Sequence, residues 1–303
     1  MVAAVSLQEG IDLLARFLSR QASRQGLLAR RALARPATGD AALTLRLVRE
    51  MSRELRRDGS LGGAFVPSVW RLIELVELGS DEENAAMHPL IRWILDHQDR
   101  AGAYSEGCAR PRHEQRACEH FLGGFFAPAP PTQRVAPVTL PNGKIFRVEG
   151  AARFALSCFA LRAVLLAGQQ EQPAVQRHVA SLLGLRGAWD RWGEYFTPDM
   201  MITALHALAY APDPLRGPVP GLAAILAARQ AEDGAWPQSD LFAALEALLA
   251  VRSPEAKTAV RRAAPILLVR LRRDGSFGPL AQQERALIGL RALLEADGRA
   301  GGQ

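Results

Sequence analysis

The residue types best suited to chemistry lie close together in one stretch before the middle of the chain. The sequence GCARPRHEQRACEH places Cys108, His113, Cys118 and His120 within thirteen residues. Thiolates and imidazoles are ligands that zinc prefers, and three protein ligands leave a fourth position open. We therefore expect Cys108, Cys118 and His120 to bind zinc, although the spacing C-x4-H-x4-C-x-H matches no standard zinc finger. The alternative is that Cys118 is a small buried residue and both histidines lie in a surface loop.

A second group of candidates interrupts the apolar segment 197–210. Asp199, Thr203 and His206 are separated by four and three residues, which places them on one face of a helix. Buried polar groups need partners, water or a ligand. We expect Asp199 and His206 to be catalytic and Thr203 to bind substrate. The alternative is that Asp199 only compensates the helix dipole and His206 is a hydrogen-bonded core histidine.

Both groups lie within a chain of repeats. The stretch 229–236, RQAEDGAW, ends one apolar segment and begins another, and 93–104, WILDHQDRAGAY, repeats its Gln, its Gly and its aromatic residue. A glycine can adopt the left-handed conformation that ends a helix. Weaker copies extend the series to Gly26, Gly59, Gly102, Gly187, Gly234 and Gly275, with spacings of 33, 43, 85, 47 and 41 residues. A period of about 40 residues is typical of stacked helix pairs.

The repeats predict two kinds of helix. Segments that end at the glycines have a polar face and are expected to be outer helices: 7–21, 40–56, 84–98, 173–184, 218–229 and 255–271. Segments that follow the glycines are apolar nearly all round and are expected to be inner helices: 65–78, 152–167, 197–210, 239–250 and 283–294. The first inner helix, around LLARRALA, is expected to be short because Pro36 and Gly39 follow it closely.

The repeat, aromatic-aliphatic-x3-Gln-x3-Gly-x-aromatic, resembles the QW repeat of the terpenoid (squalene) cyclase and protein prenyltransferase superfamily, which also includes prenyltransferase and squalene oxidase repeats. The resemblance implies an all-α protein, an α/α toroid of alternating outer and inner helices whose hollow centre binds an isoprenoid-like or other apolar small molecule. The prenyltransferase branch binds zinc through Asp, Cys and His. The cyclase motif DxDD and the synthase motif DDxxD are both missing from this sequence, and aromatic residues are only 6% of it. These departures disfavour carbocation cyclisation of the DxDD type.

Other inner helices carry fewer polar residues. In segment 65–78, Trp70 and Arg71 are further candidates for substrate binding. The polar residues of these helices fall into pairs that we expect to interact within the protein: Arg71 with Glu74, Arg153 with Ser157, and Glu284 with Arg291. Cys158 lies in an apolar helical segment and is expected to be a core residue.

We expect a single toroid domain, 1–303, with an irregular insertion at about 105–150. Asn142-Gly143 lies between two β-capable runs and predicts a β-hairpin. An insertion of this length is either a lid or an inert excursion. Because Pro128–Val148 contains no repeat glycine, we predict that its deletion leaves the fold intact.

The composition excludes several classes. Hydrophobic residues make up 49% of the 303, and no apolar run approaches the roughly 18 residues of a membrane span. Three cysteines give no even disulfide framework, which favours a cytoplasmic protein. Of 37 basic residues 35 are Arg, scattered among acidic residues, which indicates a GC-rich bacterial genome and no nucleic-acid partner. The net charge of +6 allows weak peripheral contact with an anionic membrane.

Three functions remain open: a zinc-dependent toroid enzyme, a toroid that binds a hydrophobic ligand without catalysis, and a protein-interaction scaffold with at most a structural zinc. No G-x-S-x-G, P-loop or dinucleotide motif occurs. Metal content would discriminate best, because loss of a catalytic zinc leaves the fold intact whereas loss of a structural zinc does not.

Overall fold

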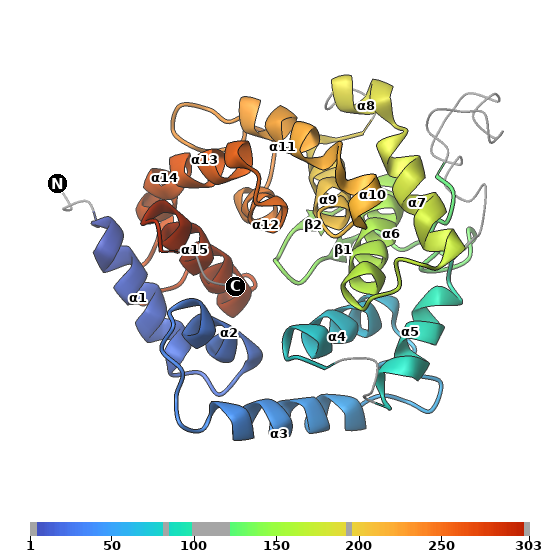
Figure 1. The fold of residues 1–303 in the computed structure, drawn as a ribbon, viewed down its shortest axis with the longest axis horizontal. Helices are drawn as coiled ribbons and strands as arrows, with labels where there is room; N and C mark the ends of the chain where they lie inside the picture. Colours follow the sequence, from blue (N-terminus) through green and yellow to red (C-terminus); the bar gives the residue numbers. More distant parts are fainter. Residues whose placement is uncertain (1–4, 81–84, 99–121, 192–195, 300–303) are drawn as a thin grey trace. The chain divides into compact units, whose positions relative to one another are not determined.

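The computed structural model describes residues 5–80, 85–98, 122–191 and 196–299, and these are predominantly helical (Figure 1). Its helices are α1 (Leu7–Ser19), α2 (Arg24–Ala32), α3 (Asp40–Arg53), α4 (Phe65–Glu77), α5 (Met87–Leu95), α6 (Glu149–Leu166), α7 (Pro173–Leu183), α8 (Arg186–Asp190), α9 (Pro198–Leu208), α10 (Asp213–Arg216), α11 (Val219–Ala228), α12 (Leu241–Val251), α13 (Pro254–Arg262), α14 (Ala264–Arg270) and α15 (Gln282–Ala296). Two short strands are β1 (Val138–Thr139) and β2 (Ile145–Phe146). No helix in these ranges is long and apolar enough to cross a membrane.

Each predicted helical segment forms a helix within a few residues of its expected bounds. The one expected at 255–271 is two helices, α13 and α14, because Pro265 has no N–H to continue the first. The short first inner helix exists as α2. The short helices α8 and α10 were not expected.

Close contacts divide the chain into two compact units. Unit 1 comprises the described residues of Met1–Arg49, Pro141–Lys144 and Ala223–Gln303, and unit 2 those of Glu50–Leu140 and Ile145–Leu222. In unit 1 the central helix is α15, which packs against α1, α2, α12 and α13. In unit 2 it is α6, which packs against α4, α5, α7 and α9. The single-domain organisation stays a prediction.

Three repeat turns have the same hydrogen bonds. In each, an Asp side chain accepts a hydrogen bond of 2.9 Å from the backbone N–H two residues later: Asp58 from Ser60, Asp233 from Ala235, and Asp274 from Ser276. The glycine between them has a φ of +82° to +90°. At Gly234 a Cβ atom would lie 2.3 Å from the carbonyl oxygen of Arg262, so this turn packs directly on the end of α13. Glycine is required there by both backbone conformation and space.

In the turn at Gly234, the Gln and Trp of the repeat bind neighbouring segments. The buried Gln230 amide donates to the carbonyl oxygens of Gly234 at 2.9 Å and Ala259 at 2.8 Å, which joins the turn to α13. The Trp236 indole donates to the Leu226 carbonyl at 2.9 Å, which joins the turn to α11. These bonds satisfy carbonyls left free where helices end. At this turn, the repeat residues therefore have a structural role.

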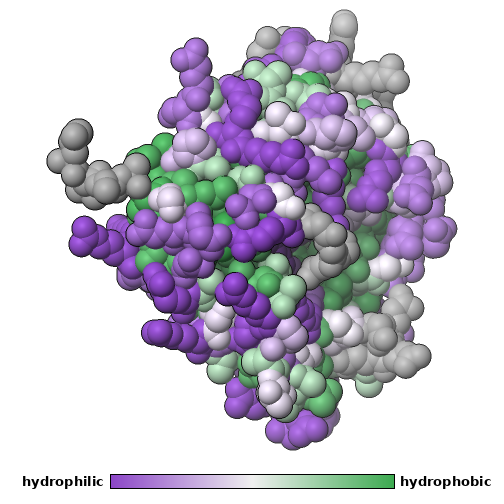
Figure 2. Space-filling view, turned by 60° about the vertical axis from the view of Figure 1, so that its left-hand side comes forward, coloured by the Kyte–Doolittle hydropathy of each residue, from purple (hydrophilic) through white to green (hydrophobic). Residues whose placement is uncertain are grey.

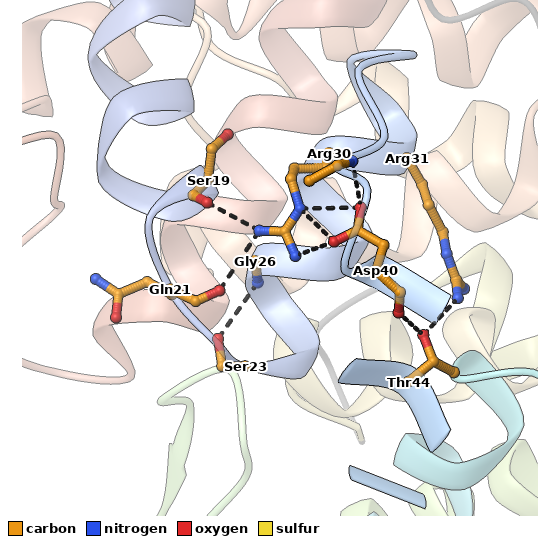
Figure 3. A network of polar contacts seen from close by, with 9 residues as sticks. Ser19, Gln21, Ser23, Gly26, Arg30, Arg31, Asp40 and Thr44 are labelled. Atoms are coloured by element: carbon orange, nitrogen blue, oxygen red, sulfur yellow. Dashed lines mark hydrogen bonds and ion pairs between the residues drawn. The ribbon is translucent and has the colours of Figure 1, made fainter. Parts of the chain in front are cut away.

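A polar network in unit 1 holds α2 between its neighbours (Figure 3). Arg30 donates to the Asp40 carboxylate at 2.6 and 2.8 Å and to the Ser19 carbonyl at 2.8 Å. Asp40 also accepts from the Ala37 N–H at 2.9 Å. The hydrogen bond from Arg30 is the main cause of a lowered pKa at Asp40. The buried Arg30 guanidinium holds α2 in place, because a helix this short would be only marginally stable by itself.

The predicted hairpin is confirmed. Its strands are antiparallel, with Val138 opposite Phe146 and Thr139 opposite Ile145. Gly143 has a φ of +86° in the connecting loop. Within unit 1, the Asn142 side-chain amide donates to Glu246 at 2.9 Å, and the Asn142 backbone carbonyl accepts from Arg285 at 2.9 Å. The tip of the hairpin is therefore fixed on helices α12 and α15.

The preceding Pro-rich segment is also packed, within unit 2. The Glu149 carboxylate accepts hydrogen bonds from the backbone N–H groups of Val135 and Ala136. Burial raises the pKa of this carboxyl, but these two bonds and the contact with Arg153 together lower it by more. Arg153 donates to carbonyls at 129, 130 and 133 over 2.6 to 3.0 Å. Ala136, Leu140 and Phe146 are buried. The repeat pattern does not reveal these contacts, and they argue against the prediction that Pro128–Val148 can be deleted with the fold left intact.

Candidate active site

The three polar residues predicted on one face are all in helix α9. Asp199 and His206 are buried, with 9% and 7% of their surface exposed. Thr203 is half-buried, and its hydroxyl donates to the Asp199 backbone carbonyl at 2.8 Å. Pro198 begins the helix, and its fixed φ favours a first helical position. The face therefore presents one carboxyl and one imidazole within two turns.

One partner of His206 is Arg162, which the sequence analysis did not select. Arg162 lies on α6, is 8% exposed, and approaches Nδ1 of His206 with Nη1 at 3.3 Å. Because a guanidinium has only donors, Nδ1 accepts in this contact, and the proton of a neutral imidazole is then on Nε2. The available signal was a charged residue within the apolar run FALSCFALRAV.

The site is bounded by aromatic and apolar groups. The rings of Tyr210 and His206 lie 6.0 Å apart. Helix α9 buries Met200, Met201 and Ile202 beside its polar residues. The Arg162 guanidinium, the His206 imidazole and the Asp199 carboxyl thus lie on two neighbouring helices of unit 2 among largely apolar side chains. Such an arrangement can bind an acceptor-rich group at the end of an apolar molecule, and can move a proton to or from it.

The substrate-binding candidates on α4 have different surroundings. Trp70 stacks on Phe159 of α6, with ring centroids 6.2 Å apart. Arg71 donates to the Met51 carbonyl and Glu54 at 2.8 Å and to Glu74 at 3.2 Å. The predicted pairing of Arg71 with Glu74 is confirmed. The role of Trp70 and Arg71 in substrate binding stays a prediction.

Two other predicted pairs are wrong. Arg153 binds Glu149 and backbone carbonyls instead of Ser157. Glu284 binds Arg24 and Gln25 of α2, instead of pairing with Arg291 along its own helix. Glu284 thus pairs with another segment, whereas Arg153 pairs with Glu149 on its own helix and also binds carbonyls of another segment. Burial strengthens such contacts because it excludes water.

A second buried polar group lies beside α6. Ser157 accepts the Phe126 N–H at 3.0 Å, and its oxygen lies 3.5 Å from Nε2 of His178. His178 is fully buried, and burial lowers its pKa to about 3. Cys158 is buried as expected, and burial raises its thiol pKa well above the usual range. These groups are closed to substrate and belong to the core.

The predicted zinc ligands Cys108, Cys118 and His120, with His113, lie outside the described residues. Within the ranges that are described, no group of three or more His, Cys, Asp or Glu side chains could hold a metal ion. The zinc site stays a prediction from the sequence alone.

Comparison with known proteins shows the fold. The sequence matches no protein-family profile and no curated protein. The structure is similar to that of the type II terpene cyclase MstE from Scytonema without ligand, with a TM-score of 0.54, 13% identity, and coverage of 97% of this chain and 99% of that one. It is also similar to a variant of MstE in complex with its substrate geranylgeranyl dihydroxybenzoate, with a TM-score of 0.51, 14% identity and coverage of 97% of both chains.

These similarities span nearly the whole chain, which therefore has the α/α-toroid fold of terpenoid cyclases, as the resemblance of its repeat implied. At 13 to 14% identity the likeness extends to fold and not to chemistry. The particular activity has to be argued from the site.

Proposed function

We propose that this protein binds an isoprenoid-like molecule, with Arg162 and His206 holding its polar end. The observation that carries the proposal is the buried contact between these two side chains on adjacent helices α6 and α9. The apolar residues of both helices suit a hydrocarbon chain. A toroid of the same fold binds a geranylgeranyl compound, which supports the ligand class.

The chemistry of the pair favours an oxygen-rich end. Arg162 keeps its charge at every physiological pH, and Nε2–H of His206 is a second donor. A phosphate, carboxylate or phenolate offers acceptors for both. Asp199 and His206 are the candidate acid and base for a transfer or elimination at that end. Cyclisation started by a DxDD motif is not proposed, because the sequence has none.

The test is equilibrium binding, followed by tryptophan fluorescence, of geranylgeranyl diphosphate and of geranylgeraniol, which has the same chain without the charge. The wild-type protein should prefer the diphosphate, and Arg162→Met should reduce this preference by about tenfold or more, the equivalent of a charged hydrogen bond. Arg162→Lys should retain part of it.

Arg92→Met provides the matched control, since Arg92 is an exposed arginine on α5 of the same unit. It should change neither affinity. Failure of both compounds to bind would refute the isoprenoid proposal. If the wild-type and Arg162→Met proteins prefer the diphosphate over the alcohol to the same extent, Arg162 does not bind the charged end of the ligand.

A second candidate function, a zinc enzyme acting on the same ligand class, rests on the Cys and His spacing of the sequence. Zinc should be measured in tag-free protein and in the variant with Cys108→Ser and Cys118→Ser. Stoichiometric zinc that the variant loses without unfolding supports a catalytic metal. No zinc in the wild-type protein rejects it and leaves the binding function.

A further inference from the structure

The outer surface of helix α14 is unusual for a helix of a water-soluble fold. Val269 is 81% exposed, and Pro265 is also exposed beside the half-buried Ile266. The opposite side of the helix is fixed in unit 1, where Leu267 is fully buried and Leu268 lies against Gly10 of α1. The apolar side chains therefore face outward from a firmly held helix.

Basic residues surround this apolar surface. The stretch 254–276 holds six basic residues and two acidic ones, a net charge of +4 out of +6 for the whole chain. Arg262, Arg270 and Arg273, which flank the apolar side chains, are all exposed. In Figure 2, where the side that carries α1 and α14 is turned forward, an apolar area is bordered by hydrophilic residues. Arginines that look scattered along the sequence are concentrated here.

We infer that this surface, Pro265, Ile266 and Val269 with Arg262, Arg270 and Arg273, docks on a membrane that contains anionic lipids. An apolar centre enters the headgroup region while surrounding arginines bind the lipid phosphates. The long arginine stems also suit a partly apolar environment. The inference is independent of the proposed function, and would place the protein where apolar substrates concentrate.

The positive charge of this surface favours a membrane over two other partners, a second copy of the chain and a nucleic acid. A second copy of the chain, paired symmetrically through the same surface, would bring two sets of arginines together, and like charges repel. A nucleic acid would satisfy the arginines but leave Val269 and Ile266 against phosphates. An anionic bilayer satisfies both the apolar and the charged parts.

The experiment is co-sedimentation of the intact protein with phosphatidylcholine vesicles, with and without phosphatidylglycerol. We expect binding only to the anionic vesicles, weakening as salt rises. Replacing both Arg270 and Arg273 by Gln should reduce binding about 25-fold, at roughly fivefold per arginine. Val269→Glu should reduce it about tenfold by placing a negative charge in the apolar centre.

Leu45→Glu is the matched control, because Leu45 is 69% exposed on α3 and lies outside the surface defined above. It should bind as the wild-type protein does, and all variants should keep the wild-type melting temperature. Absence of binding to anionic vesicles would overturn the inference, as would equal binding by the Val269→Glu protein. A dimer in light scattering that Val269→Glu dissolves would overturn it in favour of a second copy.

Discussion

The fully buried His178 makes the stability of the protein depend on pH in a range where carboxyl groups contribute little. Its pKa falls from 6.5 to about 3 because burial disfavours the imidazolium. Between these values the unfolded chain binds a proton that the folded protein excludes. The contribution of His178 to the free energy of unfolding is therefore fully present above pH 6.5 and is lost as the pH falls toward 3.

The magnitude follows from the shift. One pKa unit is equivalent to about 1.4 kcal/mol, so the full shift is an upper bound of about 5 kcal/mol. Carboxyl groups titrate at lower pH, so the useful window is pH 7.5 to 5. Over this window His178 should account for about 2 kcal/mol of lost unfolding free energy, a large part of the stability of an ordinary domain.

Urea unfolding followed by circular dichroism at several pH values measures the effect. The wild-type protein should lose about 2 kcal/mol more than His178→Leu between pH 7.5 and 5. His88→Gln, which changes an exposed histidine of α5, should retain the wild-type dependence. Parallel pH profiles for the wild-type and His178→Leu proteins would show that the imidazole is not buried as described.

Three further outcomes are expected, from a repeat turn, from helix α11 and from the insertion. Gly234→Ala should cost about 2 to 4 kcal/mol in chemical unfolding, because its φ is +86° and a Cβ would meet a carbonyl oxygen at 2.3 Å. Gly221→Ala, in α11 with open space around it, should instead gain about 0.5 to 1 kcal/mol. Deletion of Pro128–Val148 should lower the melting temperature by about 10 °C, because it leaves the buried Arg153 without its carbonyl partners. An unchanged melting temperature would instead indicate that the segment is a loose flap.

The parts of the fold that sequence could predict are those determined locally. Helix ends depend on glycines and prolines within a few residues, and the hairpin depends on Asn142-Gly143. The positions of the helix ends and of the hairpin could therefore be predicted from the sequence. The break between α13 and α14 was also local, and the signal at Pro265 was simply outweighed by the apolar periodicity on either side. The spacing of the repeats indicated stacked helix pairs. The resemblance to the QW repeat then implied the toroid fold that the comparisons show.

Only the residues of the candidate site that lie on α9 could be predicted from the sequence, because Arg162 comes from a different helix, α6. Asp199 and His206 stood out as polar residues at helical spacing, whereas Arg162 was one charge in a helix without a polar face. Likewise Glu284 had a plausible partner on its own helix, yet binds Arg24 of α2. Helical spacing identifies which residues share a face, but packing decides which faces meet.

Helix α6 shows how buried polar residues can be separated into structural and functional ones. Because it is buried on nearly all sides, each of its polar residues has to be satisfied by a particular neighbour. Arg153 binds Glu149 and three carbonyls of the insertion, and Ser157 accepts a hydrogen bond from the Phe126 N–H beside the fully buried His178, so both residues are held by groups that fix the fold. Arg162 approaches the imidazole of His206, a side chain that can change its protonation and its partner. On the proposed function, a ligand would compete for the contact between Arg162 and His206, which makes this pair the first of the polar residues of α6 to test for chemistry.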